Sequence, residues 1–181
     1  MNEDRDAALI LDCQRGDRRA QNLLINRYVQ PIFNAAYRML GDTEDARDVT
    51  QTVFLKAFEH LDRFDPKYRF FSWIYRIAVN ESIDQINRRC PPCPEPRQQA
   101  SAARGPAELA ESSETCASVQ SVLMELQADH RAVIVLRHFA DLSYQEIAQI
   151  LEIPVKTVKS RLFSARHTMK DKLKARGFRS Q

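Results

Sequence analysis

The sequence predicts an all-α protein of two small helical domains joined by a flexible linker. Apolar residues recur at helical spacing through most of the 181 residues, and no alternating strand pattern of any length appears. Between Cys90 and Ala117 the composition changes to Pro, Gln, Ala, Ser and Arg, with four prolines from Pro91 to Pro96. Such a segment buries too little apolar surface to offset the entropy of ordering it, which is typical of a linker.

The first domain is expected to start with two short helices within residues 5–28, separated by a turn at Gly16 and Asp17. Pro31 is expected to begin the next helix, because proline fits the first turn, where its missing amide hydrogen is not needed. Apolar residues then follow at helical spacing until Gly41, which is expected to end this helix.

A longer helix follows the helix-start signature Asp42–Asp45, and its apolar stripe extends from Ala46 to Leu61. The segment from Asp62 to Phe71 contains a proline and is expected to be a loop. Ser72 is expected to cap one more helix, which continues to the neighbourhood of Arg89.

The second domain is expected to begin near Val119 with two amphipathic helices and to end in a helix-turn-helix. In this motif Ser143 caps the first helix with Glu146 as its capping-box partner, Pro154 breaks it, and a basic helix starts at Lys156. Residues 117–181 carry eleven basic and six acidic side chains, which predicts a polyanionic partner for this domain. A short helix, a tight turn and a basic helix form the geometry that places the second helix in the DNA major groove.

A second group of binding residues lies in and after the loop of the first domain. Four basic and six aromatic side chains fall within the fourteen residues from Arg63 to Arg76. Single-stranded DNA binding requires cations that follow the phosphates and aromatic faces that accept unstacked bases. Trp73 also has the spacing of a core residue, and the polar stripe at i+4 steps from Ser72 to Arg88 is the expected DNA-facing side.

Several other functional classes find no support in the sequence. The N-terminus has no signal-peptide pattern and no apolar run reaches bilayer length, so a cytoplasmic protein without membrane insertion of its own is expected. No paired carboxylates, nucleophile–base set or glycine-rich phosphate loop supports an enzyme or receptor domain, and neither a cofactor nor a metal is expected. Cys90 and Cys93 form a CxxC pair, which fits a redox pair, half of a zinc site, or a proline-rich linker that contains two thiols. The main rival is a dimeric helix-turn-helix repressor or response regulator, and the aromatic and basic loop disfavours it.

Four segments stand out together: DARDVTQTVF from Asp45, FSWIYRIAVN from Phe71, LSYQEIA from Leu142 and PVKTVKSR from Pro154. In this order and spacing they resemble the extracytoplasmic-function (ECF, group 4) sigma factors of the sigma-70 family. The resemblance implies sigma region 2 over residues 5–90, a flexible linker over 91–117 and sigma region 4 over 118–178. It also implies no catalytic site, and as partners core RNA polymerase through its β and β′ subunits, promoter DNA and an anti-sigma factor.

The resemblance assigns roles to residues of the first domain. The acidic helix is expected to dock on basic clamp helices of the large polymerase subunit, and Arg47 stands where the family commonly has another acid, which should weaken this docking. The residues expected to bind core polymerase are Asp45, Asp48, Gln51, Phe54 and Leu55. Those expected to bind the promoter −10 element and help to melt it are Arg63, Phe64, Lys67, Tyr68, Arg69, Ser72, Arg76 and Asn80.

In the second domain the N-terminal half of the basic helix is expected to enter the major groove of the −35 element, with Val158 and Leu162 in the core and Thr157 as a cap. The expected −35 contacts are Lys156, Lys159, Ser160, Arg161, Phe163 and Arg166. Elements about one and a half turns apart are separated by on the order of 55 Å, at about 3.4 Å per base pair. A linker of about 25 residues extends to about 80–90 Å, so it spans this distance.

Overall fold

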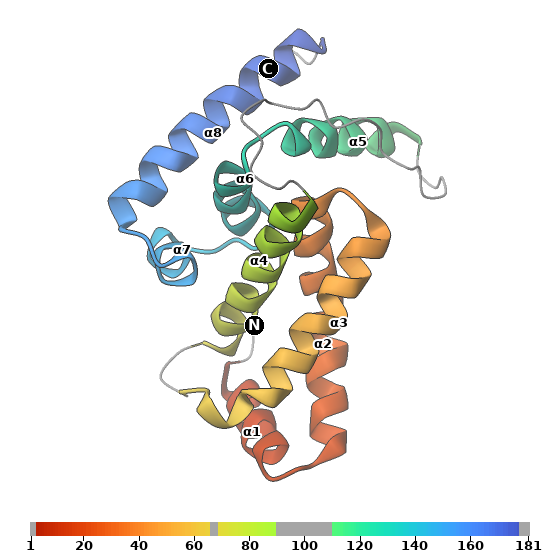
Figure 1. The fold of residues 1–181 in the computed structure, drawn as a ribbon, viewed down its shortest axis with the longest axis vertical. Helices are drawn as coiled ribbons and strands as arrows, with labels where there is room; N and C mark the ends of the chain where they lie inside the picture. Colours follow the sequence, from red (N-terminus) through yellow and green to blue (C-terminus); the bar gives the residue numbers. More distant parts are fainter. Residues whose placement is uncertain (1–2, 66–68, 90–109, 178–181) are drawn as a thin grey trace.

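The computed structural model describes residues 3–65, 69–89 and 110–177, which form helices joined by turns, with no strand among them. Two helical lobes lie against each other (Figure 1), which confirms the all-α fold class. The N-terminal lobe contains α1 (Glu3–Gln14), α2 (Arg18–Leu40), α3 (Thr43–Glu59), the 3₁₀ turn η1 (Leu61–Arg63) and α4 (Phe70–Arg89). The C-terminal lobe contains α5 (Ala110–Met124), α6 (Ala128–Ile134), the π-helical segment η2 (Val135–Phe139), α7 (Tyr144–Leu151) and α8 (Val155–Ala175).

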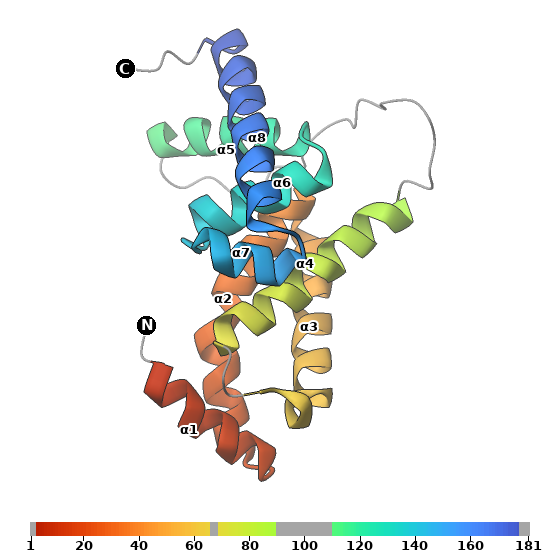
Figure 2. The same cartoon turned by 90° about the vertical axis from the view of Figure 1, so that its left-hand side faces the viewer.

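The N-terminal lobe is a bundle of α2, α3 and α4, with α1 packed against α2 and η1 at its base (Figures 1 and 2). The apolar faces of the three bundle helices meet at residues that are fully buried, among them Leu24, Ile32, Met39, Val53 and Ile74. Each of these residues belongs to an apolar stripe of the sequence or lies at helical spacing from one. The bundle is therefore the amphipathic packing that the periodicity implies.

The helix predicted to start at Pro31 does not start there, because α2 continues through this residue from Arg18 to Leu40. Tyr28 and Ile32, on either side of Pro31, both lie in the core, so burial favours one uninterrupted helix. A proline inside a helix removes one backbone hydrogen bond. Tertiary packing of the apolar face outweighs this local cost.

Helix caps agree with the sequence at most ends, and two assignments are wrong. Gly41 adopts the left-handed conformation with φ 74° and ends α2, and the Asp42 side chain accepts a hydrogen bond of 3.0 Å from the Asp45 amide at the start of α3. Ser72 is not a cap, because α4 begins at Phe70 and the Ser72 hydroxyl is buried inside the first turn without a hydrogen-bond partner. Likewise α8 begins at Val155 after Pro154, so the predicted cap Thr157 lies within its first turn.

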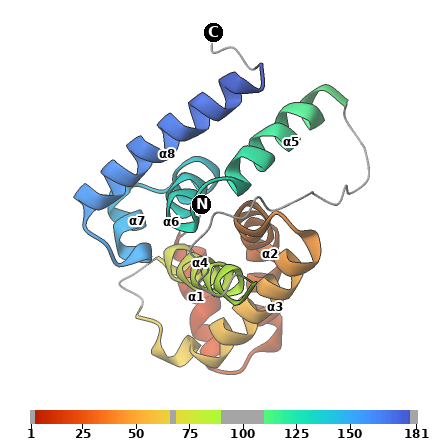
Figure 3. The ribbon, with the colours of Figure 1, turned by 45° about the horizontal axis from the view of Figure 1, so that its top comes forward.

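The C-terminal lobe packs α5, α7 and α8 around α6 and η2, as Figure 3 shows from above. α5 begins at Ala110, which lies inside the range predicted as linker, while residues 90–109 lie outside the described part of the chain. The predicted capping box at the start of α7 is confirmed: the Ser143 hydroxyl accepts from the Glu146 amide, and the Glu146 carboxylate accepts from the Ser143 amide. Glu152, with φ 53°, then ends α7 and directs the chain into α8.

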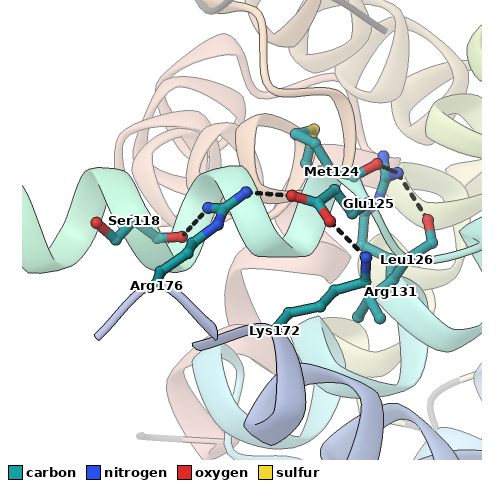
Figure 4. A network of polar contacts seen from close by, with 7 residues as sticks. All are labelled: Ser118, Met124, Glu125, Leu126, Arg131, Lys172 and Arg176. Carbon is teal, nitrogen blue, oxygen red and sulfur yellow. Dashed lines mark hydrogen bonds and ion pairs between the residues drawn. The ribbon is translucent and has the colours of Figure 1, made fainter. Parts of the chain in front are cut away.

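Arg131 of α6 organises the end of α5 from inside the lobe. Its guanidinium donates hydrogen bonds of 2.8–2.9 Å to the carbonyl oxygens of Leu123, Met124 and Leu126. Figure 4 shows the bonds to Met124 and Leu126. A fourth bond reaches the Met39 carbonyl at the end of α2 in the other lobe. Burial lowers the pKa of Arg131 to about 10, so the group is still a cation at neutral pH. A charged donor thus satisfies carbonyls that a helix end leaves without partners.

The two lobes contact each other through several of their helices, which the sequence did not predict. One part of the contact joins α5, α6 and η2 to the C-terminal end of α2, and the other joins α7 to α4. At the first part, Gln120 accepts from Arg38 and donates to the Tyr37 carbonyl, both at 3.0 Å. Arg38 also lies over the Phe139 ring, 4.7 Å from its centroid.

Candidate nucleic-acid interface

α8 has one face in the core and one face in solvent. Val158, Leu162 and Ala165 are buried against α6 and α7, as expected for the inner side of a recognition helix. The opposite side, called here the outer face of α8, consists of exposed residues at spacings of three and four: Lys156, Lys159, Ser160, Phe163 and Arg166. Phe163 is 75% exposed, so the folded chain offers an aromatic ring between cations to something outside itself.

Neighbouring side chains position the cations of α8. The Lys159 ammonium lies 5.9 Å from the centroid of the Tyr144 ring, which is within cation–π range. Arg161 instead forms an ion pair of 2.7 Å with Asp129 of α6, so it braces α8 against the lobe and is less available to DNA than the outer face. Sequence reasoning gave no role to Tyr144 or Asp129, because their partners become neighbours only after folding.

Arg166 is held by His138 of η2, whose Nε2 accepts a 3.1 Å hydrogen bond from the Arg166 Nε. Burial, together with the charges of Arg166 and Arg137, lowers the pKa of His138. The ring is therefore kept neutral, which is the state in which its Nε2 can accept a hydrogen bond. No feature of the sequence pointed to His138.

The second candidate surface lies on the N-terminal side of α4 and the loop before it. Arg63, Arg69, Arg76 and Asn80 are all exposed, and the last two are one turn apart on the same side of α4. Lys67 and Tyr68, which were predicted for this surface, lie outside the described residues. Ser72 is mainly covered, with its hydroxyl buried, so the exposed side of α4 is formed by the residues that follow it.

Most of the aromatic residues near this surface are core residues, which corrects the interpretation of the segment as a set of stacking platforms. Phe64 is 6% exposed and lies 5.6 Å from Phe70 and 5.3 Å from Trp73, measured between ring centroids. Tyr75 is also buried, which raises its pKa to about 12. Trp73 is half-buried and packs on the core. The described aromatic residues of this segment are therefore explained mainly by packing in the core.

Of the site residues predicted on the acidic helix α3, some are exposed and others are buried. Asp48, Gln51 and Leu55 are exposed, and Leu55 has 72% of its surface in solvent. Asp45 faces α4, where it pairs with Arg89, and Phe54 is 8% exposed. These two side chains therefore support the helix and do not form its outer surface in this conformation.

Arg47, the residue that departs from the family pattern, forms a 2.6 Å ion pair with Glu44 one turn before it. This pair compensates one acidic charge of the first turn. The net negative charge presented by α3 is smaller as a result.

No group of three or more His, Cys, Asp and Glu residues that could hold a metal occurs within the described ranges. Cys90 and Cys93 fall in the part of the chain that the structure does not describe, so the three interpretations of this pair stay predictions. None of the described helices is long and apolar enough to cross a membrane.

Comparisons with known proteins match both lobes. The sigma-70 region 2 family model matches residues 24–90, and a sigma-70 region 4 model matches residues 116–169. The chain is 34% identical over 181 residues to the RNA polymerase sigma-H factor of Pseudomonas aeruginosa, covering 93% of this chain and 94% of that one. The chain belongs to the ECF sigma factor family. As a member of this family of transcription initiation factors, it is not an enzyme.

Two further relatives carry ECF sigma factor names. SigW of Bacillus subtilis is 33% identical over 177 residues, covering 91% of this chain and 95% of its own. The sigma-E factor of Escherichia coli is 35% identical over 180 residues, covering 93% of this chain and 94% of its own.

Among solved structures, that of CnrH in complex with the cytosolic domain of CnrY matches with a TM-score of 0.73 and 28% identity, covering 94% of this chain and 97% of that one. Each lobe holds about half of the chain or less, so a match of one lobe alone would give a much lower score. Both lobes therefore match in a similar relative placement. RpoE of Bartonella quintana, solved with the anti-sigma factor NepR, has the same fold at 22% identity, with a TM-score of 0.66 over 84% of this chain and 96% of that one.

Proposed function

We propose that this ECF sigma factor directs core RNA polymerase to promoters by binding duplex DNA at −35 through the outer face of α8 and a melted −10 element through α4. The observation that carries the proposal is the outer face of α8, where Lys156, Lys159, Ser160, Phe163 and Arg166 are exposed together. Cations there contact phosphates and base edges, and the Phe163 ring suits contact with a thymine methyl group.

The −10 function rests on α4. Arg69 and Arg76 supply cations for the DNA backbone, and the Asn80 amide can donate to and accept from a base edge. Since Phe64 is buried, base stacking falls to the edge of half-buried Trp73 and to Tyr68, which lies outside the described residues. Base stacking therefore contributes less to binding of the −10 element than the number of aromatic residues in the segment suggested. Polar contacts contribute more.

The docking surface for core polymerase is proposed on α3, at Asp48, Gln51 and Leu55. An exposed leucine beside a carboxylate suits a basic partner surface with an apolar patch, because burial of the leucine adds to the ionic attraction. Asp45 acts indirectly, through its ion pair with Arg89 that fixes α3 against α4.

Two further parts of the proposal follow from the family. Two of the matching structures are complexes, CnrH with the cytosolic domain of CnrY and the sigma factor RpoE with the anti-sigma factor NepR, which supports an anti-sigma factor as a partner of this chain too. We place the protein in the cytoplasm, where core polymerase and promoter DNA are found. The domain limits remain region 2 over 5–90 and region 4 over 118–178, with α5 extending the second toward Ala110.

The test is transcription by purified core polymerase on a randomised promoter library, with and without the chain. Transcripts that depend on the chain and share a −35 and a −10 motif are expected. Asp48→Arg should reduce co-purification with core at least about tenfold, since a repulsive charge replaces an attractive one in the interface. Gel shift of duplex DNA by a dimer of the free chain, with no dependence on core, would instead support the repressor interpretation.

A further inference from the structure

Helix α1 contacts both ends of the segment that joins η1 to α4. At its C-terminal end, the Gln14 side-chain amide donates a 2.9 Å hydrogen bond to the Leu61 carbonyl of η1. Nearer its N-terminal end, the Asp6 carboxylate accepts a 2.5 Å hydrogen bond from the Tyr28 hydroxyl, and the Tyr28 ring lies 5.3 Å from the ring of Phe70, where α4 begins. Figure 2 shows α1 and η1 together at the base of the N-terminal lobe. One helix thus connects the two ends of this segment.

The contact at η1 fixes the turn that carries Arg63. The Leu61 carbonyl accepts from the Gln14 side chain and also, at 3.2 Å, from the backbone amide of Phe64, which closes the 3₁₀ turn. A carbonyl oxygen has two lone pairs, so it accepts both bonds at once. Leu61 and Phe64 are buried, whereas Arg63 is exposed. Gln14 therefore holds the turn from which Arg63 projects into solvent.

The contact at the start of α4 is a buried polar group of three side chains. Asp6 is 8% exposed and also accepts from Arg27, and Tyr28 is fully buried. Burial and the hydrogen bond to Asp6 raise the pKa of Tyr28, so its hydroxyl stays protonated and donates to the carboxylate. The charge of Arg69, the residue before α4, also acts on this hydroxyl. Removal of a partner from a buried carboxylate is costly, so this end of α1 is held firmly.

The two contacts lie beside two cations of the proposed −10 surface. Arg63 is the last residue of η1 and Arg69 precedes Phe70, and both arginines are exposed. Asp6 and Gln14 are eight residues apart on one helix, which corresponds to about 12 Å at about 1.5 Å per residue. Because the helix is stiff, α1 sets the separation between its two contacts.

The polar contacts of α1 are separate from its apolar attachment. Ile10 and Cys13 are buried, and through its apolar side α1 packs against α2. The sigma-70 region 2 match begins at residue 24, so it does not include α1. The hydrogen bonds described above reach the ends of a segment whose cations are proposed to bind DNA. At such a place a fixed geometry favours binding, because less conformational freedom is lost when the ligand is captured.

We propose that α1 positions the −10 surface, with Gln14 and Asp6 as positioning residues that hold the η1 end and the α4 end at a fixed separation. This rests on the proposed binding of the −10 strand by Arg63, Arg69 and α4. The fixed ends present the two cations in the arrangement that follows the DNA backbone. Gln14 and Asp6 act through these neighbours and do not contact DNA themselves.

The test uses holoenzyme formed from the full chain and core polymerase. Gln14→Met removes the amide donor at similar volume, and Tyr28→Phe removes the hydroxyl that Asp6 holds. Asp6→Asn is the conservative variant, because its amide oxygen still accepts from Tyr28. Ile10→Val is the matched control, since it removes one buried methyl group from α1 and leaves both polar contacts in place.

The main readout is the affinity of holoenzyme for a labelled single strand that carries a −10 motif from the promoter library. Gln14→Met and Tyr28→Phe should each lower this affinity about threefold or more, because each variant loses one hydrogen bond that orders the surface. Asp6→Asn should retain most of the affinity. Binding of core polymerase and of duplex −35 DNA should stay at the wild-type level in all variants. Ile10→Val should lower the free energy of unfolding in urea and bind the strand as wild type does.

The double variant Gln14→Met, Tyr28→Phe distinguishes positioning from stability. If α1 fixes a separation, loss of either contact releases it, and the double variant should bind the strand little worse than the weaker single variant. Independent effects on stability at sites this far apart add instead.

The outcomes separate this inference from the proposed function. If strand affinity follows the stability of the free chain in every variant, Ile10→Val included, α1 only stabilises the fold and the inference is overturned. The proposed function then stands as long as Arg76→Ala with Asn80→Ala reduces promoter opening. If Arg63→Ala with Arg69→Ala binds the strand as tightly as wild type, the −10 role of these two cations is wrong, and so is their positioning by α1.

Discussion

Phe163 and Lys159 lie side by side on the outer face of α8 and are exposed although the helix around them packs tightly. Exposure of a large aromatic ring has a solvation cost that nothing within the described chain offsets. In the proposed function, the −35 DNA covers this ring. This distinguishes Phe163 from Phe64 and Phe54, which are aromatic, near a predicted site, and buried.

Replacement of Lys159 or Phe163 by alanine should weaken discrimination between −35 sequences by about 1–3 kcal/mol for each base that the side chain no longer reads. Lys174→Ala, in the last turn of α8, should instead lower affinity for all sequences and reduce the salt dependence of binding. Holoenzyme affinity for a set of −35 variants at two salt concentrations measures both effects. If both kinds of variant rank the −35 sequences as wild type does, α8 does not read the bases.

His138 predicts a pH dependence of stability. Its pKa is lower in the folded chain than the unfolded value of about 6.5, so protonation favours the unfolded state. Its contribution is fully present above pH 6.5 or so and is lost as the pH falls through the folded pKa. The free energy of unfolding should thus decrease from about pH 7.5 to about pH 5.5 more steeply in wild type than in His138→Gln. Urea unfolding across this range measures it, and equal slopes would contradict the assignment.

Among the helices, the capping box formed by Ser143 and Glu146 stabilises the start of α7, the helix that precedes the recognition helix α8. Ser143→Ala should cost about 1 kcal/mol, because it removes the acceptor for the Glu146 amide. Ser121→Ala, at an exposed position in α5, should change the free energy of unfolding by much less. Urea denaturation compares the two. An equal loss in both variants would show that the capping box contributes nothing specific.

The elements could largely be predicted from the sequence, because each signal is local. Ser143 with Glu146, Asp42 before α3 and Gly41 after α2 act within one turn of helix, and all are confirmed. Pro31 failed because packing of the faces on both sides of it outweighs a local signal. The start of α4 also failed, since Phe70 and Phe71 join the core and extend the helix beyond Ser72.

For the candidate site, the sequence predicted which segments carry exposed polar residues better than it predicted which side chains are exposed. The segments that carry exposed polar residues were identified correctly, but exposure itself depends on which side of each helix meets its neighbour. That is why Asp45 and Phe64 were placed on a surface and lie inside. Contacts such as Arg166 with His138 join residues far apart in the chain, and no local pattern reports them.

In the whole molecule, the two lobes pack against each other, whereas binding to both promoter elements requires them to be apart. Folded together, they share ion pairs and buried hydrogen bonds between α2, α4 and the C-terminal lobe. Bound to a promoter, they must be on the order of 55 Å apart, at about 3.4 Å per base pair. The linker length permits the second state, and the weak ion pairs make the first reversible.

In the proposed function, this sigma factor melts a promoter by capturing the −10 strand on α4. Permanganate reactivity of thymines near the start site, with core polymerase and duplex promoter, measures this melting. Arg76→Ala with Asn80→Ala should leave core binding and −35 binding nearly intact but greatly reduce reactivity, and a template with a pre-melted bubble should restore part of the activity. Arg15→Ala, at an exposed position in the turn after α1, is the control and should behave as wild type.

Loss of the Arg76 pair with Glu152 would if anything ease separation of the lobes, so reduced melting in that variant cannot come from a more closed chain. Promoter opening at the wild-type rate by the correctly folded Arg76→Ala, Asn80→Ala variant would contradict the claim.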